Sequence, residues 1–324
     1  MQQLIIGLVV AILFTYSSME WWQVVLLGIC GAGFFVYSIY KHQESLVFQP
    51  VLMNMRIPEE NPAGYRSPEE RKLPYVPVKF QTEDKENITG WFIPARDIPS
   101  EKAATILYFH ANAGNMGFRL PFLEKLFFLT PCNVLIISYR GYGKSSGTPN
   151  EEGVYRDATA ALKWLQNYDK VDPKRIFLFG RSLGGAVAIN LASRKQDQIR
   201  GLILENTFTS ISAMADKLFP FLTLVKPYIL RMKFDSISLI SGIKCPILFI
   251  SGLMDELVPP LHMQKLYDSA TSAKRVVIVR VPDGLHNDTW MKGGEYVFDQ
   301  IRKFIEKTIP DAPKMEQSSV VEDE

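Results

Sequence analysis

The chain has 324 residues, of which 47% are hydrophobic, and a formal net charge of +2. This length suffices for one large domain of roughly 250 residues or for two small ones. The nearly balanced charge argues against nucleic-acid binding, which needs a strongly basic surface. Three widely spaced cysteines form no CxxC pair, so we expect free thiols. Four histidines show no metal-ligand spacing such as HExxH, and we predict neither a metal nor a cofactor.

The amino-terminal segment is strongly apolar. Residues 21–40 contain no charged side chain, which is enough for a helix to cross a bilayer, and Trp21, Trp22 and Tyr40 flank this run as interfacial aromatic residues do. A second apolar run lies at 4–18. A cleaved signal peptide is the alternative, but no basic segment precedes the run. We therefore predict a retained anchor, formed by one tilted span rather than a hairpin.

The sequence does not decide on which side of the membrane the domain after the span lies. Lys41 and Arg56 follow the predicted span, and by the positive-inside rule they favour a cytosolic domain. Glycosylation sequons at Asn87 and Asn287 would matter only in a lumen.

The remaining chain divides by composition. The anchor is placed at 1–45, and a proline-rich segment at 46–75 is expected to be an extended connector. Residues 76–309 alternate between short apolar runs and helical patterns, which is typical of an α/β domain. An apolar, proline-bearing segment at 208–242 interrupts this alternation and is predicted to be a small cap. The acidic segment at 310–324 is predicted to be a disordered tail.

The apolar runs are rich in β-branched and aromatic residues, as in parallel strands that are buried on both faces. Two opening strands are predicted at 76–80 and 88–93. Six further strands are predicted at 104–110, 133–139, 175–180, 202–206, 246–252 and 275–281. Helices are predicted between them at 117–130, 151–168, 183–195, 260–270 and 294–309. The expected fold is a mostly parallel sheet of eight strands with helices on both faces.

One short motif carries the chemistry. Ser182 lies in a GxSxG pattern between a predicted strand and a predicted helix. A nucleophilic serine needs such a strained turn, and Gly180 and Gly184 remove the Cβ atoms that would clash there. The following helix also points free N–H groups at the site. We predict that Ser182 is a nucleophile, with a purely structural turn as the alternative.

A second GxSxG match, at 143–147, serves as an internal control. It also follows a strand, but Thr148, Pro149 and Asn150 come next, which indicates a loop rather than a helix in progress. Ser138 stands where a phosphate-binding loop would need its first glycine. We therefore predict a glycine-rich loop there.

A serine nucleophile needs a histidine base and a carboxylate to orient it. On a sheet of this type the chain order is serine, acid, histidine. His286 lies in a glycine-bearing loop after the last strand, whereas His262 lies on a predicted helix, so His286 is the predicted base. Asp255 follows a buried strand and is the predicted acid. Glu205, which ends the preceding strand, is the alternative acid, and Asp255 is then a turn or helix-cap residue.

The oxyanion needs backbone N–H donors. Leu183, which follows the nucleophile, should supply one. The second should come from the loop after the third strand, where Asn112 or Ala111 is the expected donor. Arg181 is expected in a surface or cap ion pair rather than bound to an anionic substrate group.

These motifs resemble one family: the membrane-anchored serine hydrolases related to alpha/beta hydrolase domain-containing protein 13 and its fungal bud-emergence-type relatives. The resemblance covers residues 75–309, and it rests on YFHANAGNMGFR, SYRGYGKSSG, FLFGRSLGGAVAI, LENTF, ISGLMDELVPP and PDGLHNDTW. It implies an alpha/beta hydrolase fold and a triad of Ser182, Asp255 and His286. It also implies a type II single-pass protein of the endoplasmic reticulum or another internal membrane. Many members have His-Gly-Asn where this chain has Ala111 after His110.

The leading hypothesis is ester or thioester hydrolysis through an acyl-enzyme. The anchor and the apolar cap favour a lipid or acylated substrate drawn from the membrane. A peptidase on the same triad and a non-catalytic membrane scaffold are the alternatives.

Overall fold

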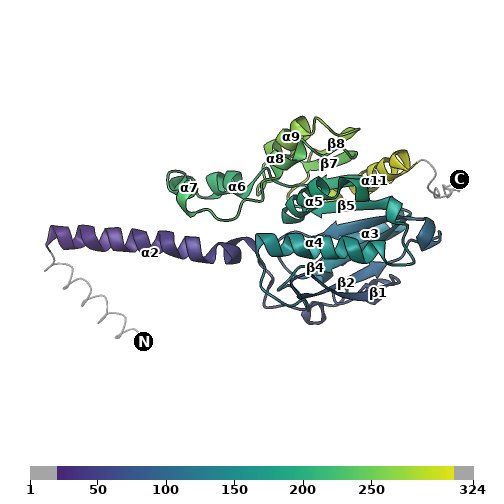
Figure 1. The fold of residues 1–324 in the computed structure, drawn as a ribbon, viewed down its shortest axis with the longest axis horizontal. Helices are drawn as coiled ribbons and strands as arrows, with labels where there is room; N and C mark the ends of the chain where they lie inside the picture. Colours follow the sequence, from purple (N-terminus) through teal and green to yellow (C-terminus); the bar gives the residue numbers. More distant parts are fainter. Residues whose placement is uncertain (1–19, 310–324) are drawn as a thin grey trace, which may run out of the picture.

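The computed structural model describes residues 20–309. The apolar run at 4–18 and the acidic segment at 310–324 lie outside the described residues. A long helix leads into a layered α/β domain and extends away from it along the longest axis of the molecule (Figure 1).

The domain is built on one sheet of eight strands in the order β1-β2-β4-β3-β5-β6-β7-β8. β1 pairs with β2, and β2 with β4, in antiparallel fashion, and all other pairs are parallel. The predicted fold class is confirmed. The strands are Val76–Gln81 (β1), Asn87–Ile93 (β2), Ala104–Phe109 (β3), Cys132–Ser138 (β4), Ile176–Arg181 (β5), Gly201–Glu205 (β6), Ile247–Gly252 (β7) and Val276–Val281 (β8).

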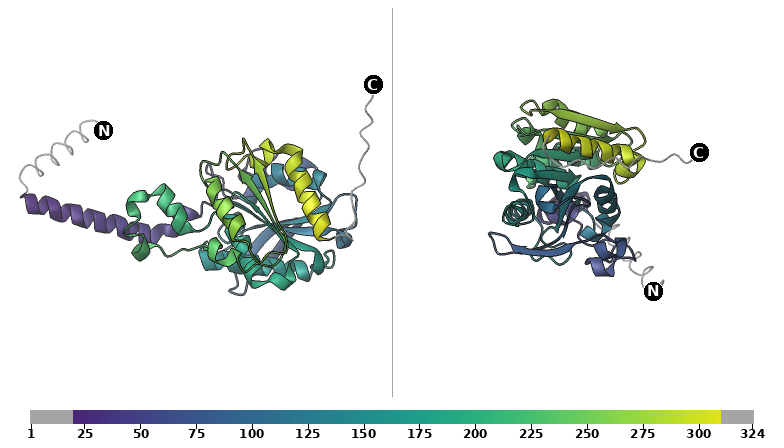
Figure 2. Two further views of the ribbon diagram at one scale, coloured as in Figure 1. Left: turned by 90° about the horizontal axis from the view of Figure 1, so that it is seen from above. Right: turned by 90° about the vertical axis from the view of Figure 1, so that its right-hand side faces the viewer.

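Helices cover both faces of the sheet (Figure 2). The helices are Trp21–Val47 (α2), Leu120–Leu129 (α3), Glu151–Gln166 (α4), Leu183–Arg194 (α5), Ile211–Leu218 (α6), Lys226–Ile229 (α7), Ser236–Ile240 (α8), Pro260–Ser269 (α9), Thr289–Lys292 (α10) and Gly294–Thr308 (α11). Side chains of α4, α5, α8 and α9 pack with one set of alternating strand residues, and those of α3 and α11 pack with the other. Alternation along a strand divides its side chains between two faces, which gives two apolar cores.

The strands differ in burial according to their place in the sheet. β3, β4, β5, β6 and β7 are buried along their whole length, as predicted for central parallel strands. β8 is an edge strand in which only Val279 and Val281 are buried, while Arg280 is exposed. The expectation that the run at 275–281 is fully buried on both faces is therefore wrong, because β8 is at the edge of the sheet that residues 20–309 form.

The segment expected to be an extended connector is packed onto the domain instead. Gln49 forms a parallel bridge with Ala113. Asn61 is buried and exchanges two side-chain hydrogen bonds with Asn115, of 2.8 and 2.9 Å. Leu73 is part of the core under α3. Prolines fix the backbone of this segment, but its buried side chains hold it against the loop that follows β3.

The cap lies between β6 and β7. Its helices α6 and α7 do not cover the sheet but lie beside the carboxyl-terminal half of α2 (Figures 1 and 2). Helix α2 is long and apolar enough to cross a membrane. The cap therefore brings the segment after β6 alongside a candidate membrane span.

Candidate active site

The turn between β5 and α5 holds Ser182 in a strained conformation. Its backbone angles are φ 52° and ψ −120°, a region that residues with a side chain rarely adopt. Its N–H donates to the carbonyl of Glu205 at 2.9 Å, and its carbonyl accepts from Thr207 Oγ1 at 2.7 Å. The end of β6 thus holds the turn in place.

Two glycines allow the helix to approach the sheet. A Cβ atom on Gly180 would lie 2.3 Å from the carbonyl oxygen of Gly184, and one on Gly184 would lie 2.0 Å from that of Phe109. Both contacts are with backbone, which cannot move aside. The close approach of α5 to β3 and β5 therefore requires glycine at both positions.

Three side chains form one line of hydrogen bonds. His286 Nε2 lies 3.0 Å from Ser182 Oγ, and His286 Nδ1 lies 2.8 Å from Asp255 Oδ2. Asp255 follows β7 and His286 follows β8, so both come from loops at the carboxyl edge of the parallel strands. All three side chains are buried. The structure thus brings together the three residues that the sequence singled out.

The Asp255 carboxylate is oriented by its own loop. Its Oδ1 accepts from the N–H groups of Leu257 at 3.0 Å and Val258 at 2.7 Å. This leaves Oδ2 for the histidine.

The alternative candidates lie in other contacts. His262 is on α9, and its Nδ1 lies 3.0 Å from Thr209 Oγ1. Glu205 Oε2 accepts from Arg181 Nε at 2.8 Å and from Nη2 at 2.6 Å. Arg181 does form an ion pair, but the pair is buried beneath the site rather than placed on the surface or the cap.

Asn206 joins the strands to the loop that carries His286. Its Nδ2 donates to the carbonyls of Leu285 and His286, both at 3.2 Å, and to Thr289 Oγ1 at 2.8 Å. Its Oδ1 accepts from the Gly252 N–H at 2.9 Å. No local sequence pattern predicts this role for Asn206. The available signal was an asparagine at a strand end, since asparagine adopts the observed positive φ of 45° more readily than most residues.

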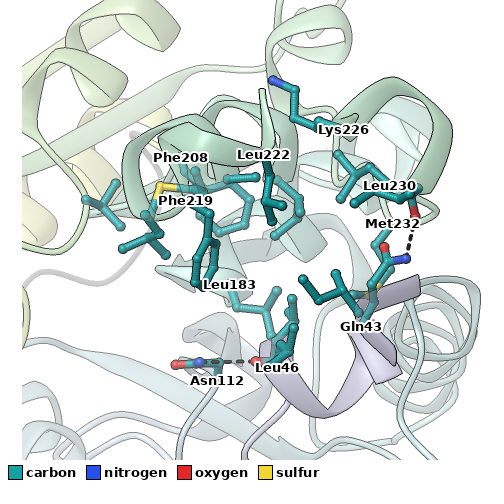
Figure 3. Close-up of a pocket in the computed structure, with 18 of the residues that line it drawn as sticks. Gln43, Leu46, Asn112, Leu183, Phe208, Phe219, Leu222, Lys226, Leu230 and Met232 are labelled. Carbon is teal, nitrogen blue, oxygen red and sulfur yellow. Dashed lines mark hydrogen bonds between the residues drawn. The ribbon is translucent and has the colours of Figure 1, made fainter. Parts of the chain in front are cut away.

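Two of the three predicted oxyanion donors, Leu183 and Asn112, line one cavity. Leu183 is the first residue of α5, so its N–H has no acceptor within the helix. Asn112 lines the same cavity as Ser182 and Leu183, whereas Ala111 does not line it. The Asn112 side chain donates to the Val47 carbonyl at 3.1 Å, so it is engaged elsewhere (Figure 3). Neither the Asn112 nor the Ala111 N–H makes a hydrogen bond within residues 20–309, so it is the place of Asn112 in the cavity wall that favours it over Ala111 as the second donor.

The cavity has a volume of about 340 Å³ and is lined mostly by apolar side chains (Figure 3). Ser182, Leu183 and Asn112 come from the catalytic end. The other side chains come from α2, the cap and the loop after Asp255. They include Phe35, Ile39, Leu46, Phe208, Met214, Phe219, Leu222, Ile229, Met232 and Val258.

The second GxSxG match is a loop fastened to β2. Ser145 Oγ donates to the Ser138 carbonyl at 2.8 Å and accepts from the Thr89 N–H at 2.9 Å. Ser146 Oγ accepts from the Asn87 N–H at 2.8 Å. Both hydroxyls therefore hold backbone. Within residues 20–309, no three or more His, Cys, Asp or Glu side chains are grouped so that they could hold a metal ion.

Comparison with known proteins identifies the family. Residues 104–231 match the alpha/beta hydrolase fold family. The chain is 39% identical over 299 residues to alpha/beta hydrolase domain-containing protein WAV2 of Arabidopsis thaliana, a match that covers 89% of this chain and 94% of that protein. This chain belongs to the alpha/beta hydrolase family. Protein bem46 of Schizosaccharomyces pombe is 38% identical over 90% of this alpha/beta hydrolase and 92% of its own length. The predicted resemblance is thereby confirmed.

Two further likenesses concern the membrane and the fold. A Saccharomyces cerevisiae relative, named uncharacterized membrane protein YNL320W, is 34% identical over 83% of this chain and 91% of its own length. The structure of the Pyrococcus furiosus esterase Pf2001 superposes with a TM-score of 0.63 at 22% identity, over 81% of this chain and 99% of that one. At this identity the likeness shows the shared fold.

His110 supports the loop that carries Asn112. Its ring is fully buried against Tyr139, its Nδ1 lies 2.7 Å from the Ala111 carbonyl, and its Nε2 has no partner within residues 20–309. Burial, with a smaller effect from Arg119, lowers the pKa of His110 to about 3. The histidine is therefore held neutral in this alpha/beta hydrolase.

We predict an acid sensitivity that depends on His110. Its pKa is lower in the folded than in the unfolded chain, so between about pH 6.5 and pH 3 the unfolded chain binds the extra proton and stability falls as the pH falls. From pH 7 to pH 5, the wild type should lose about 2 kcal/mol more unfolding free energy than His110→Gln, which does not titrate. Urea unfolding of the detergent-solubilised protein, followed by tryptophan fluorescence, measures this. Equal losses in both proteins would contradict it.

Proposed function

We propose that this alpha/beta hydrolase is a serine hydrolase that cleaves an ester or thioester through an acyl-enzyme. The observation that carries the proposal is the unbroken line of hydrogen bonds from Ser182 through His286 to Asp255, set at one end of an apolar cavity. In this proposal Ser182 is the nucleophile, His286 the base, and Asp255 the carboxylate that holds the histidine in one tautomer.

The proposed reaction has two halves. Ser182 Oγ attacks the carbonyl carbon while its proton passes to His286 Nε2, and the oxyanion binds the N–H groups of Leu183 and Asn112. His286 then gives the proton to the departing alkoxide or thiolate. A water molecule, deprotonated by His286, next attacks the acyl-enzyme. The acid is released and the proton returns to Ser182.

The composition of the cavity favours a lipid or acylated substrate. Its polar side chains are Gln43, Asn112, Ser182 and Lys226, and the rest are apolar. Lys226 forms an ion pair with Asp216, so it is not an unpaired cation for a peptide carboxylate. This favours an ester of an acyl chain over the peptidase alternative. The candidate span α2, and a relative named a membrane protein, support a single-pass anchor. By family resemblance, we propose an internal membrane.

The two serine motifs provide a matched test. Ser182→Ala should abolish labelling by a fluorophosphonate probe in native membranes, because the probe reacts only with an activated serine. Ser145→Ala removes a hydroxyl from the other GxSxG motif and should leave labelling at the wild-type level. Wild-type protein without labelling, or labelling that survives Ser182→Ala, would contradict the proposed nucleophile and favour the scaffold alternative.

The role of Asn206 is testable by kinetics. Asn206→Ala removes the donors that hold the carbonyls of Leu285 and His286, so His286 should shift relative to Ser182. Such a displacement should lower kcat roughly 100-fold with little change in KM, because the cavity walls are unaltered. Steady-state hydrolysis of a p-nitrophenyl ester measures both constants, and circular dichroism checks folding. A change confined to KM would contradict this role.

A further inference from the structure

The end of the candidate membrane span forms one wall of the catalytic cavity. Phe35, Ile39, Gln43 and Leu46 of α2 line it, at intervals of three or four residues. Such spacing places side chains on one face of a helix. With a rise of 1.5 Å per residue, this stripe extends for about 17 Å along α2. Figure 3 shows Gln43 and Leu46 opposite the cap residues Phe219, Leu222 and Leu230.

A buried glutamine fastens this wall to the cap. Gln43 is only 4% exposed, its Nε2 donates to the Ile229 carbonyl at 2.6 Å, and its Oε1 accepts from the Arg231 N–H at 2.8 Å. Arg231 also pairs with Glu44 at 2.7 Å. The backbone of α2 leaves helical geometry at His42, next to these contacts. The wall and the cap are therefore joined by specific polar bonds as well as by apolar packing.

The same end of α2 contacts the loop that carries the proposed oxyanion donor. The Asn112 side chain donates to the Val47 carbonyl, and the Asn112 carbonyl accepts from the Gln49 N–H at 3.2 Å. Gly114 N–H donates to the Gln49 carbonyl at 2.9 Å. One end of the cavity wall is thus fixed beside Ser182. Phe35 lies at the other end of this wall, nearer the middle of α2.

The cap surface beside α2 is apolar. The exposed fractions of Phe221, Leu224 and Tyr228 are 68%, 87% and 84%, respectively. Exposed apolar surface that is continuous with a candidate membrane span is the kind of surface that a bilayer covers. Lys41, Glu44 and Arg231 lie near the kink in α2, where polar side chains begin. The apolar end of the cavity at Phe35 thus lies on the apolar side of these polar residues, within the candidate span.

We propose that the cavity is a groove for the acyl chain of a bilayer lipid, with α2 as one wall and the cap as the other. The chain enters from the bilayer along α2, and its carbonyl reaches Ser182. Side chains on the inner face of α2 then set the acyl length that the enzyme accepts. This inference rests on the proposed function, which supplies the ester or thioester cleavage.

Two tryptophan substitutions test the groove at different depths. Leu46→Trp narrows it near the catalytic end, and Ile39→Trp narrows it about 10 Å farther along α2. Full-length protein in phosphatidylcholine vesicles is assayed with p-nitrophenyl acetate, octanoate and palmitate. Ile39→Trp should lower the palmitate rate roughly tenfold or more and spare octanoate, whereas Leu46→Trp should lower both. Acetate hydrolysis reports the chemical step in each variant, so the chain-length effect is measured as the ratio of the palmitate or octanoate rate to the acetate rate of the same variant.

Two further variants complete the test. Phe34→Trp is the matched control, because Phe34 is exposed on α2 and does not line the cavity, so its chain-length profile should equal that of wild type. Leu224→Asp places a charge on the apolar cap surface, and it should slow palmitate hydrolysis while leaving acetate, which reaches the site from water.

The outcomes separate the groove from the chemistry. If Ile39→Trp and Leu46→Trp keep the wild-type ratio of palmitate to acetate, or if both lose acetate hydrolysis, the groove is overturned while the proposed function stands. Wild-type protein that neither reacts with fluorophosphonate nor cleaves any ester overturns the proposed function, and with it this inference.

Discussion

Helix α5 meets strands β3 and β5 more closely than side chains would normally allow, and the position of Ser182 follows from this contact. Ser182 can occupy its strained turn only because Gly180 and Gly184 let backbone meet backbone, within distances that a Cβ atom would forbid. The cost of such a conformation is of the order of 1–3 kcal/mol and must be offset by surrounding contacts. Here the end of β6 provides them, through the Glu205 carbonyl and the Thr207 hydroxyl. The strained residue is therefore held by residues at the end of β6 as well as by the first turn of α5, where the Gly185 N–H donates to its carbonyl at 2.9 Å.

The strand that holds the serine also holds its partners. Glu205 pairs with Arg181 beneath the turn, and Asn206 binds the loop that carries His286. Three consecutive residues, from Glu205 to Thr207, thus connect the turn of Ser182 with the loop that carries His286. Each contact uses a buried polar group with a specific partner, and such groups favour one arrangement because an unpaired buried polar group is costly. The geometry of the site therefore depends on the end of β6 as much as on the turn between β5 and α5.

Local patterns predicted those parts of the site whose signals lie within a few residues. The strand, the glycines and the helix around Ser182 are contiguous, and the order of acid and base then favours His286 and Asp255, with Glu205 left as the alternative acid. The strand predicted at 104–110 differs from β3 by one residue for the same reason. The role of Asn206 could not be predicted, because its partners lie about 80 residues further along the chain. The packing of residues 46–75 was missed because proline content indicates stiffness but not what a segment rests against. The contact between Gln43 and Ile229 joins positions 186 residues apart and leaves no local pattern.

The bond between Asn112 and Val47 has a consequence for how the enzyme can be studied or altered. An anchor is commonly regarded as a detachable part, and a soluble catalytic domain is commonly obtained by cutting it away. In this chain the last turn of α2, the candidate membrane span, holds the loop beside Ser182, and the preceding turns line the cavity. We therefore expect a fragment that begins after α2 to have a more open cavity and a less firmly held loop at Asn112. If α2 is a membrane anchor, as proposed, proteolysis at this junction would alter the proposed active site and release the domain at the same time.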